Sequence, residues 1–476
     1  MTTQRHRLLI SLSAAAVSVV LALVPGAAVA QPEQAPTKPA AGGLAIPHRA
    51  EGRVVKAAGA PRAEFHAVGV DAIEPTLGIT KRGDVFYTAT GGLSPVVMKS
   101  TDKGRTWEEA SPNLAGQNTH FLTLDPYIYV DESTGRIFDI DLTVACAYLS
   151  ISDDSGESWI TNPVACGRPI NDHQTLFSGP PALTPMTVFP EVVYYCWNDF
   201  GLGTSCSKSL DGGLTWIPET QAFFGIQSGD DGEGDVCGGF IGHGIVAEDG
   251  TVYIPKEHCG RPWIAISKDE GLTWQQIQVA TNPTEPGGSD TTVALDSKGN
   301  LIYGYESKEK FYLSVSEDGG ETWSKSINAT APGVTEINLP TLDAGKDGSV
   351  ALSYMGSENS PYPRCKPDCR EGDWADEYQK VTWNGYITMT TDVLSRDPLF
   401  FSGSVNDRRD PIYRGHCDFF TGRCSPVLDF LDIEIGPDGT PYATYVDACT
   451  TICATGGPRD ASAAMVGRLA GGPPLR

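Results

Sequence analysis

One eight-residue pattern, Ser-x-Asp-x-Gly-x-(Ser/Thr)-Trp, constrains the fold of this 476-residue chain more than any other feature. The pattern occurs five times, at 100–107, 152–159, 209–216, 267–274 and 316–323. Successive copies begin 52, 57, 58 and 49 residues apart. A repeat of that period, with short strands between turns, is typical of a β-propeller in which each copy belongs to one four-stranded sheet.

Each position of the pattern suits a tight turn. The serine hydroxyl and the aspartate carboxylate can accept hydrogen bonds from backbone N–H groups, and the glycine can adopt a positive φ angle. The tryptophan can bury its ring between neighbouring sheets, where an aromatic side chain contributes most. We therefore interpret the five aspartates as turn residues rather than catalytic groups: Asp102, Asp154, Asp211, Asp269 and Asp318.

A second, looser pattern consists of a short strand, a turn with glycine and an apolar strand. It accompanies the five copies and continues at 342–356 and 433–447, which brings the number of units to seven. The sequence therefore predicts an all-β fold, a seven-bladed β-propeller of four-stranded antiparallel blades. The sixth unit carries an insert at 357–381. The last unit lacks one strand, and we expect residues 52–58 to complete it and remove an exposed sheet edge.

The amino-terminal residues predict export. Arg5 and Arg7 precede an apolar run at 8–24, and small residues up to Ala30 supply a cleavage pattern. We expect a signal peptide at 1–30, a disordered Pro- and Ala-rich leader at 31–48, and a single domain at 49–476 that is secreted as a monomer. No later apolar segment approaches the length needed to span a bilayer.

The cysteines support the same compartment. All twelve follow the predicted signal peptide, and an even number in an exported protein favours disulfides. The usual pair-plus-pair spacing of a zinc site is missing. The sequence leaves the connectivity open, although neighbouring couples suit links within hairpins or single loops. The expected disulfide cysteines are Cys146 and Cys166, Cys196 and Cys206, Cys237 and Cys259, Cys365 and Cys369, Cys417 and Cys424, and Cys449 and Cys453.

The formal net charge of −24 argues against nucleic acid and anionic membrane surfaces as partners. A cation is a more suitable partner for such a surface. We expect no required cofactor, and calcium is the ion that we consider for the acidic channel described below.

The five copies resemble the Asp-box, or bacterial neuraminidase repeat, of the sialidase superfamily. The resemblance covers 100–323 by motif and the rest of the chain by period only. It implies a propeller fold, in a superfamily that contains sialidases, other glycosidases, polysaccharide lyases and non-catalytic receptors. Sialidases carry an arginine in an Arg-Ile-Pro motif on the first inner strand, whereas this chain has Glu74 and Pro75 in that stretch. Arg261 is a candidate for another member of the arginine triad.

The innermost strands of a propeller all begin at one end of the central channel, so the residues that precede them should converge there. Five of the seven units place a carboxylate at this position. We expect a catalytic group of Asp125, Asp290, Glu74 and His243. We expect substrate contacts from His173, Arg261, His120 and Asp432, and we assign no metal ligands.

These residues leave three functions open. Carboxylates on opposite sides of a sugar could act in glycoside hydrolysis, and an exo-α-sialidase-like hydrolase is the favoured prediction. Alternatively, carboxylates could hold calcium while His173 or His243 transfers a proton in a lyase reaction on a uronate glycan. The third alternative is a non-catalytic propeller that binds a glycan or a protein. Any single carboxylate could instead cap a strand end.

Overall fold

The computed structural model describes residues 40–90, 94–114, 117–123, 125–143, 146–166, 171–183, 188–199, 203–224, 226–228, 234–236, 239–284, 291–361, 377, 380–415, 431–456 and 461–476. The chain divides into two units, 1–33 and 34–476, and every described residue belongs to the second. The predicted signal peptide, Asp290 and most of the insert at 357–381 lie outside the described residues.

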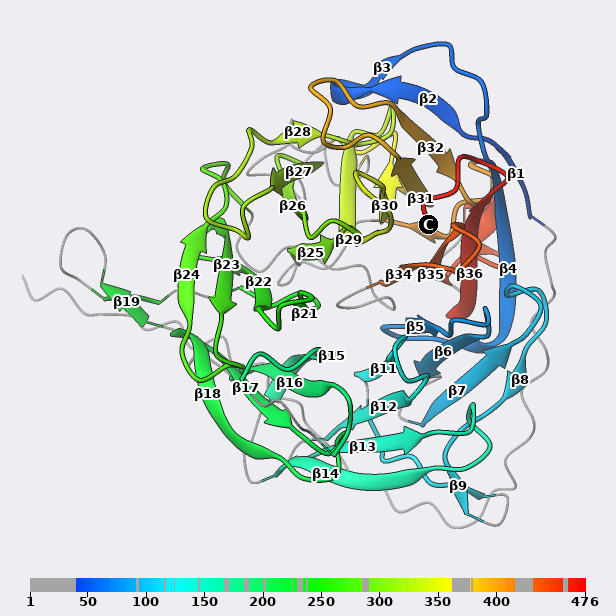
Figure 1. Cartoon of the computed structure of the whole chain (residues 1–476). Coiled ribbons are helices and arrows are strands. Elements are labelled where there is room, and N and C mark those ends of the chain that lie inside the picture. Colours follow the sequence, from blue (N-terminus) through cyan, green and yellow to red (C-terminus); the bar gives the residue numbers. More distant parts are fainter. Residues whose placement is uncertain are drawn as a thin grey trace, which may run out of the picture. The chain divides into compact units, whose positions relative to one another are not determined.

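Within this unit, six sheets are each built on four antiparallel strands that follow one another along the chain, and they are arranged in a ring (Figure 1). We call them blades 1 to 6. The first strand of each blade is nearest to the centre. The strands are β5 (Thr76–Ile79), β6 (Val85–Thr90), β7 (Pro95–Ser100) and β8 (Glu108–Glu109) in blade 1; β11 (Pro126–Val130), β12 (Ile137–Leu142), β13 (Cys146–Ser152) and β14 (Ile160–Cys166) in blade 2; β15 (Asn171–Gly179), β16 (Val192–Asp199), β17 (Gly203–Ser209) and β18 (Ile217–Phe224) in blade 3; β21 (Ile245–Val246), β22 (Val252–His258), β23 (Arg261–Ser267) and β24 (Gln275–Gln278) in blade 4; β25 (Thr292–Leu295), β26 (Leu301–Ser307), β27 (Lys310–Ser316) and β28 (Ile327–Asn328) in blade 5; and β29 (Glu336–Ala344), β30 (Val350–Ser357), β31 (Thr382–Thr390) and β32 (Phe400–Ser404) in blade 6.

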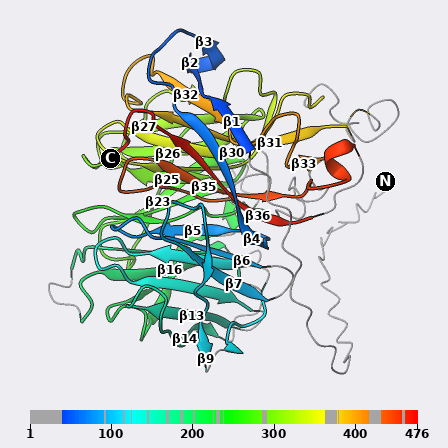
Figure 2. The same ribbon diagram turned by 90° about the vertical axis from the view of Figure 1, so that its right-hand side faces the viewer.

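The remaining large sheet, which we call the closing sheet, takes its strands from both ends of the unit. In spatial order these are β34 (Ile433–Ile435), β35 (Pro441–Asp447), β36 (Ala463–Ala470), β4 (Arg62–Asp71) and β1 (Ala40–Leu44). Both views show the red β36 beside the blue β4 (Figures 1 and 2). This antiparallel pair joins the two ends of the ring, with Arg62 opposite Ala470.

The prediction of seven four-stranded blades is wrong. The structure has six blades of four consecutive strands, and the unit at 433–447 lies in the five-stranded closing sheet. The strand that completes the ring is β4 rather than 52–58, because β4 is long enough to pair along the whole of β36, whereas the strand within 52–58 is only Arg53–Val54. Blade 6 gains two further strands along its outer edge, β2 (Ile46–Arg49) and β3 (Arg53–Val54). Thus residues 40–44 and 46–48, which the sequence analysis places in a disordered leader, lie in strands.

Short elements complete the described structure. They are β9 (Asn113–Leu114) with β10 (Gln117–Asn118), β19 (Ile226–Ser228) with β20 (Gly234–Val236), β33 (Tyr413–Arg414) beside β31, and the 3₁₀ turns η1 (Ala50–Gly52) and η2 (Cys453–Thr455). In the described part of the chain, no helix combines the length and the apolar character needed to cross a membrane.

The repeated motif forms the same hydrogen-bonded turn at each of its five positions. In blade 5, the Ser316 hydroxyl accepts the Gly320 N–H at 2.9 Å and donates to Asp318. The Asp318 carboxylate accepts the Thr322 N–H at 2.9 Å and its hydroxyl at 2.5 Å. The Thr322 hydroxyl and N–H lower the pKa of Asp318 to about 2. These bonds confirm that the aspartate of the motif is a turn residue.

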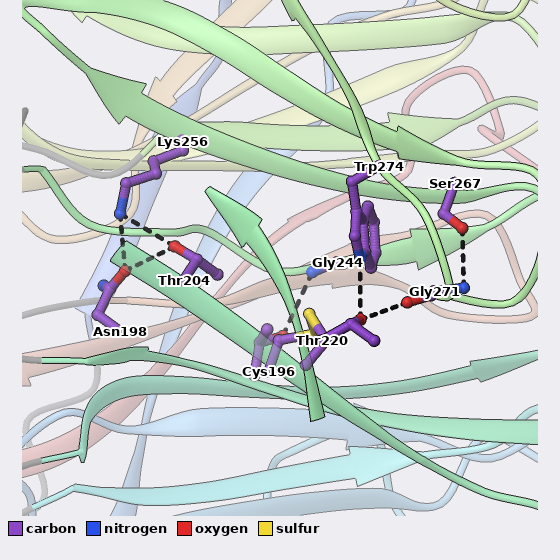
Figure 3. The surroundings of a disulfide bond; sticks show 11 residues. Cys196, Asn198, Thr204, Thr220, Gly244, Lys256, Ser267, Gly271 and Trp274 are labelled. Carbon is purple, nitrogen blue, oxygen red and sulfur yellow. Dashed lines mark hydrogen bonds between the residues drawn. A yellow bond between two sulfur atoms is a disulfide. The ribbon is translucent and has the colours of Figure 1, made fainter. Parts of the chain in front are cut away.

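Tryptophan indoles of the motif join the turns to neighbouring structure. Trp323 donates to the Gly320 carbonyl at 3.1 Å and packs edge-on against Tyr303. In blade 4, Trp274 donates instead across the interface, to the Thr220 hydroxyl of blade 3 at 3.1 Å (Figure 3). The motif therefore contributes to packing between blades as well as to the turn itself.

Blades 3 and 4 also share a buried lysine. Lys256 on β22 is 2 % exposed, and its ammonium donates to Asn198 and Thr204 of blade 3 at 2.8 and 3.0 Å. Figure 3 shows this group beside the Cys196–Cys206 disulfide, which links β16 to β17. A buried ammonium is tolerated only where acceptors surround it, so this lysine ties the two blades together.

Three of the expected disulfides are present in the described residues: Cys146–Cys166, Cys196–Cys206 and Cys449–Cys453. Cys259 is also disulfide-bonded. The cysteines at 237, 365, 369, 417 and 424 lie outside the described residues.

Side chains of the inner strands join neighbouring blades around the channel. The Thr76 hydroxyl of blade 1 accepts the Ile128 N–H of blade 2 at 2.8 Å. Equivalent threonine bonds run from Gly244 of blade 4 to Thr175 of blade 3 and from Leu342 of blade 6 to Thr292 of blade 5, both at 3.3 Å. Because each blade is a separate sheet, these bonds take the place of a continuous β-ladder.

We expect Thr76→Val to lower the free energy of unfolding by about 1–3 kcal/mol, because the Ile128 N–H would remain buried without its acceptor. Denaturant unfolding of the oxidised protein would measure the loss. Thr76→Ser keeps the hydroxyl and is the matched control. Equal stability of the valine and serine variants would contradict the role of this bond.

Candidate functional site

The strands nearest to the channel begin at one end of the ring, which we call the channel mouth. Contacts across this end show that the residues before those strands converge. The imidazole of His243, which precedes β21, lies 3.6 Å from a carboxylate oxygen of Asp432, which precedes β34. The other Asp432 oxygen accepts the Leu77 N–H of β5 at 3.0 Å. Blade 4, the closing sheet and blade 1 therefore meet at Asp432.

His243 is partly exposed at this mouth. Its side chain is 29 % exposed, whereas that of Asp432 is 7 % exposed. The imidazole packs edge-on against the Tyr127 ring, with centroids 5.1 Å apart. An imidazole that contacts both a buried carboxylate and an aromatic ring keeps one orientation and can exchange a proton with a molecule outside.

The electrostatics of this group follow from burial. Burial raises the pKa of Asp432, and the nearby His243 imidazole opposes that rise. Burial also raises the pKa of Tyr127 well above its ordinary value, and the Asp432 charge adds to the increase. The phenol of Tyr127 therefore keeps its proton, and His243 is more exposed than Asp432.

The mouth is narrow beside His243. A cavity of about 10 Å³, roughly the space for one water, is lined by His243 and parts of blades 4, 5 and 6 and the closing sheet: Gly242, Thr291, Thr292, Leu339, Pro340, Thr341 and Leu431. A ligand larger than a water molecule would therefore lie outside this cavity.

Two predicted catalytic carboxylates lie at the same end in different surroundings. Glu74, before β5, is 1 % exposed and has a φ of 50°, so it is enclosed by the fold. Asp125, before β11, is half-buried, and its carbonyl accepts the Gln174 side-chain N–H of blade 3 at 2.6 Å. The third, Asp290, lies outside the described residues. Asp125 is therefore the predicted carboxylate with the more accessible side chain of the two that are described.

The predicted substrate contacts also divide by exposure. His173 is 4 % exposed, and its Nδ1 lies 2.9 Å from the Ile241 carbonyl, so it links blade 3 to the segment before β21. Arg261 lies at the turn from β22 to β23 and is half-buried. Its guanidinium donates to the Gly260 carbonyl at 2.7 Å, and no described carboxylate forms an ion pair with it. His173 therefore has a packing role, and Arg261 is the more exposed of the two side chains.

His120 belongs to a buried cluster instead of facing a substrate. Its side chain is fully enclosed, with Nδ1 at 2.9 and 3.0 Å from the two carboxylate oxygens of Asp141 and at 3.4 Å from Asp139. Both aspartates lie on β12. Burial raises the pKa of Asp139 to about 7, against the charge of His120. These three residues are the group in the described chain that could hold a metal ion.

Sequence reasoning missed Tyr127, Asp139 and Asp141. Both aspartates stand in the apolar stretch IFDIDL of β12, at 137–142, where alternate side chains share one face. Two acidic residues on one face of a buried strand were an available signal for a polar cluster. Tyr127 carried no such signal, because an aromatic residue in an inner strand is ordinary core.

The opposite end of the channel holds more carboxylates. A cavity of about 370 Å³ there is lined by Asp131, Glu132, Glu191, Asp343 and Glu434 together with Arg476. Glu434 accepts the Ile79 N–H of β5 at 2.7 Å, and Asp343 accepts the Ile435 N–H of β34 at 2.8 Å. Burial raises the pKa of Glu434 well above its ordinary value. At least two of these acids therefore join strands around the channel.

Comparison with known proteins adds similarity in structure only. No protein-family model matches the chain, and no curated protein matches it. The Hadza microbial sialidase Hz136 is 18 % identical, with 60 % of this chain and 63 % of that chain covered and a TM-score of 0.40, so the match spans less than two thirds of that protein. A mutant of the NanB sialidase from Streptococcus pneumoniae is 13 % identical over 84 % of this chain and 68 % of that chain, with a TM-score of 0.42. A mutant of Aleuria aurantia lectin in complex with alpha-methyl-L-fucoside is 10 % identical over 67 % and 92 %, with a TM-score of 0.39. At these low TM-scores, the similarities assign no activity or ligand to this chain.

The pH dependence of stability should report the half-buried Asp343. Burial raises its pKa to about 6 from an ordinary 3.8, against the charge of Arg476. The folded state therefore binds this proton more tightly than the unfolded chain, so the contribution of Asp343 to stability falls as the pH rises from about 4 to about 6. Between about pH 4 and about pH 6, the free energy of unfolding of the wild type should therefore fall by up to about 2 kcal/mol relative to that of Asp343→Asn.

Denaturant unfolding of both proteins at several pH values would measure this difference. Asp347→Asn, which changes an exposed aspartate of the same blade, is the control. A wild-type-to-Asp343→Asn difference that stays constant with pH would contradict the assignment.

Proposed function

We propose that this protein cleaves glycans at the channel mouth, with His243 as the proton-transferring group and Asp432 as the carboxylate that orients it. The contact that carries the proposal is the 3.6 Å approach of Nδ1 of His243 to the buried Asp432. A general base needs a fixed orientation and access to its substrate, and the exposure of the His243 side chain supplies the access. The resemblance of the five turns to Asp-box proteins supports a glycan as the substrate.

Hydrolysis of a glycosidic bond is the first candidate reaction. His243 would deliver a proton to the leaving oxygen while a water attacks the sugar carbon, and the half-buried Asp125 could assist that water. This assignment keeps the sialidase-like hydrolase predicted from the sequence and gives His243, one of its four predicted catalytic residues, the role of proton donor.

Elimination on a uronate glycan is the second candidate, and two observations favour it. The accessible proton acceptor is an imidazole, and Arg261 has no described carboxylate partner, so it could bind the uronate carboxylate. His243 would take the proton from the carbon beside that carboxylate. A carbon–carbon double bond would form as the glycosidic carbon–oxygen bond breaks, and the leaving sugar would take up a proton.

We also propose that the protein acts outside the cytoplasm. The three described disulfides support this location, because such bonds persist in oxidising compartments.

The two reactions can be separated by their products. Purified protein would be incubated with sialosides, other aryl glycosides and uronate polysaccharides, each with and without a chelator. Hydrolysis releases a new reducing end without ultraviolet absorbance, whereas elimination also yields an absorbing unsaturated uronate. Retention of the protein on immobilised glycans, with no product from any substrate, would replace the enzyme by a glycan-binding propeller.

We expect His243→Ala to lower kcat by about 10²–10⁴-fold on any substrate that is turned over, because it removes the proton-transferring group. Asp432→Asn should also lower kcat and change the pH–rate profile. Steady-state kinetics would measure both effects, with melting temperatures recorded alongside, since Asp432 also accepts the Leu77 N–H. His66→Ala, at a half-buried histidine 3.4 Å from Glu64 in the closing sheet, is the control. Wild-type kcat in His243→Ala would reject the proposed site.

A further inference from the structure

We propose that His120, Asp139 and Asp141 bind a divalent transition-metal ion, such as Zn²⁺ or Mn²⁺, which fastens the loop before β11 to blade 2. One ligand atom from each side chain lies within 4.8 Å of the others. His120 comes from the loop between blades 1 and 2, whereas both aspartates come from β12. The set therefore joins two parts of the chain that no strand pairing connects.

The distances suit a shared ion. Nδ1 of His120 lies 3.4 Å from Asp139 and 2.9 Å from Asp141. Ligand atoms about 2.0–2.2 Å from one metal ion are separated from each other by about 3 Å or slightly more. The three side chains thus surround a position that a small cation could occupy with little movement.

The burial of Asp139 is the independent observation that points to a cation. Asp139 is 1 % exposed, and neither of its oxygens forms a well-oriented hydrogen bond with a described residue. Asp141, in contrast, accepts the Phe121 N–H at 2.9 Å as well as contacting His120. Nδ1 of His120 lies closer to Asp141 than to Asp139, so Asp139 is the less well compensated of the two carboxylates, and a poorly compensated buried carboxylate is unfavourable.

The donor atoms select the class of ion. Calcium and magnesium prefer a shell of oxygens, whereas imidazole nitrogen suits zinc and other first-row transition metals. One nitrogen and two carboxylates therefore favour Zn²⁺ or Mn²⁺ over the calcium considered from the sequence.

The enclosure of the cluster indicates a structural rather than a catalytic ion. The side chains of His120 and Asp139 are fully enclosed. The neighbouring Phe121 ring stacks on Tyr148 of β13, with centroids 3.6 Å apart. The ion would fix the loop that leads into β11, the strand of Tyr127, and so support the mouth from outside the site of His243.

Metal binding by the full-length protein tests the proposal without an activity assay. Protein stripped with a chelator would be titrated separately with Zn²⁺, Mn²⁺ and Ca²⁺ in a calorimeter. We expect one equivalent of Zn²⁺ or Mn²⁺ to bind and Ca²⁺ to bind at least about tenfold more weakly. A Co²⁺ complex should show visible absorption from nitrogen and oxygen coordination.

Asp139→Asn and His120→Gln should each weaken binding by at least about tenfold. His66→Gln is the matched control, because His66 contacts one carboxylate, that of Glu64, at 3.4 Å. Where a cluster variant does not fold, the melting temperature of the wild type decides: it should rise with Zn²⁺ or Mn²⁺ relative to chelator. No binding and no shift in the wild type, or undiminished binding in a folded cluster variant, would overturn the proposal. The cluster would then be a hydrogen-bonded pair with a second buried acid.

Discussion

Each blade of this ring is a separate sheet, so side chains rather than a shared β-ladder must hold neighbouring inner strands together. Hydroxyls of Thr76, Thr175 and Thr292 accept backbone N–H groups from the following blade. Between the closing sheet and its neighbours, carboxylates accept the backbone N–H groups instead. The channel is therefore lined by polar side chains that the fold itself requires. Only the polar side chains that do not join neighbouring strands remain for function.

This constraint changes how the acidic residues of the channel are interpreted. Asp343 and Glu434 accept N–H groups of neighbouring strands, and Glu74 is enclosed. Asp432 has both a structural role and a role at the candidate site. One carboxylate oxygen accepts the Leu77 N–H, and the other faces His243. A site that shares a residue with the architecture is held rigidly, which is an advantage for orienting an imidazole.

The sequence predicted features that depend on local chemistry. The five turns follow from side chains within eight residues, and His243 and Asp432 were both placed at the channel mouth by their position before an inner strand. The closing sheet could not be derived in this way, because β4 and β36 pair across most of the chain. The sequence also could not predict which side chains at the channel mouth are exposed. His173 and Glu74 both adopt a positive φ angle, which redirects the side chain in a manner that strand alternation does not predict. Asp139 and Asp141 share one face of β12, and this alternation was an available signal that the sequence analysis did not use.

The pairing of β4 with β36 also has a consequence for the order in which the molecule assembles. β4 is synthesised early. Its partner β36, Ala463–Ala470, is the last of the described strands to be synthesised. Blades 1 to 6 can form from neighbouring segments, but until β36 arrives they make an open arc with unpaired strands at either end. Such edges recruit other chains, and contacts between distant segments form slowly. The interval between translation of β4 and of β36 is therefore the period in which β4 lacks its β36 partner and the ring is open.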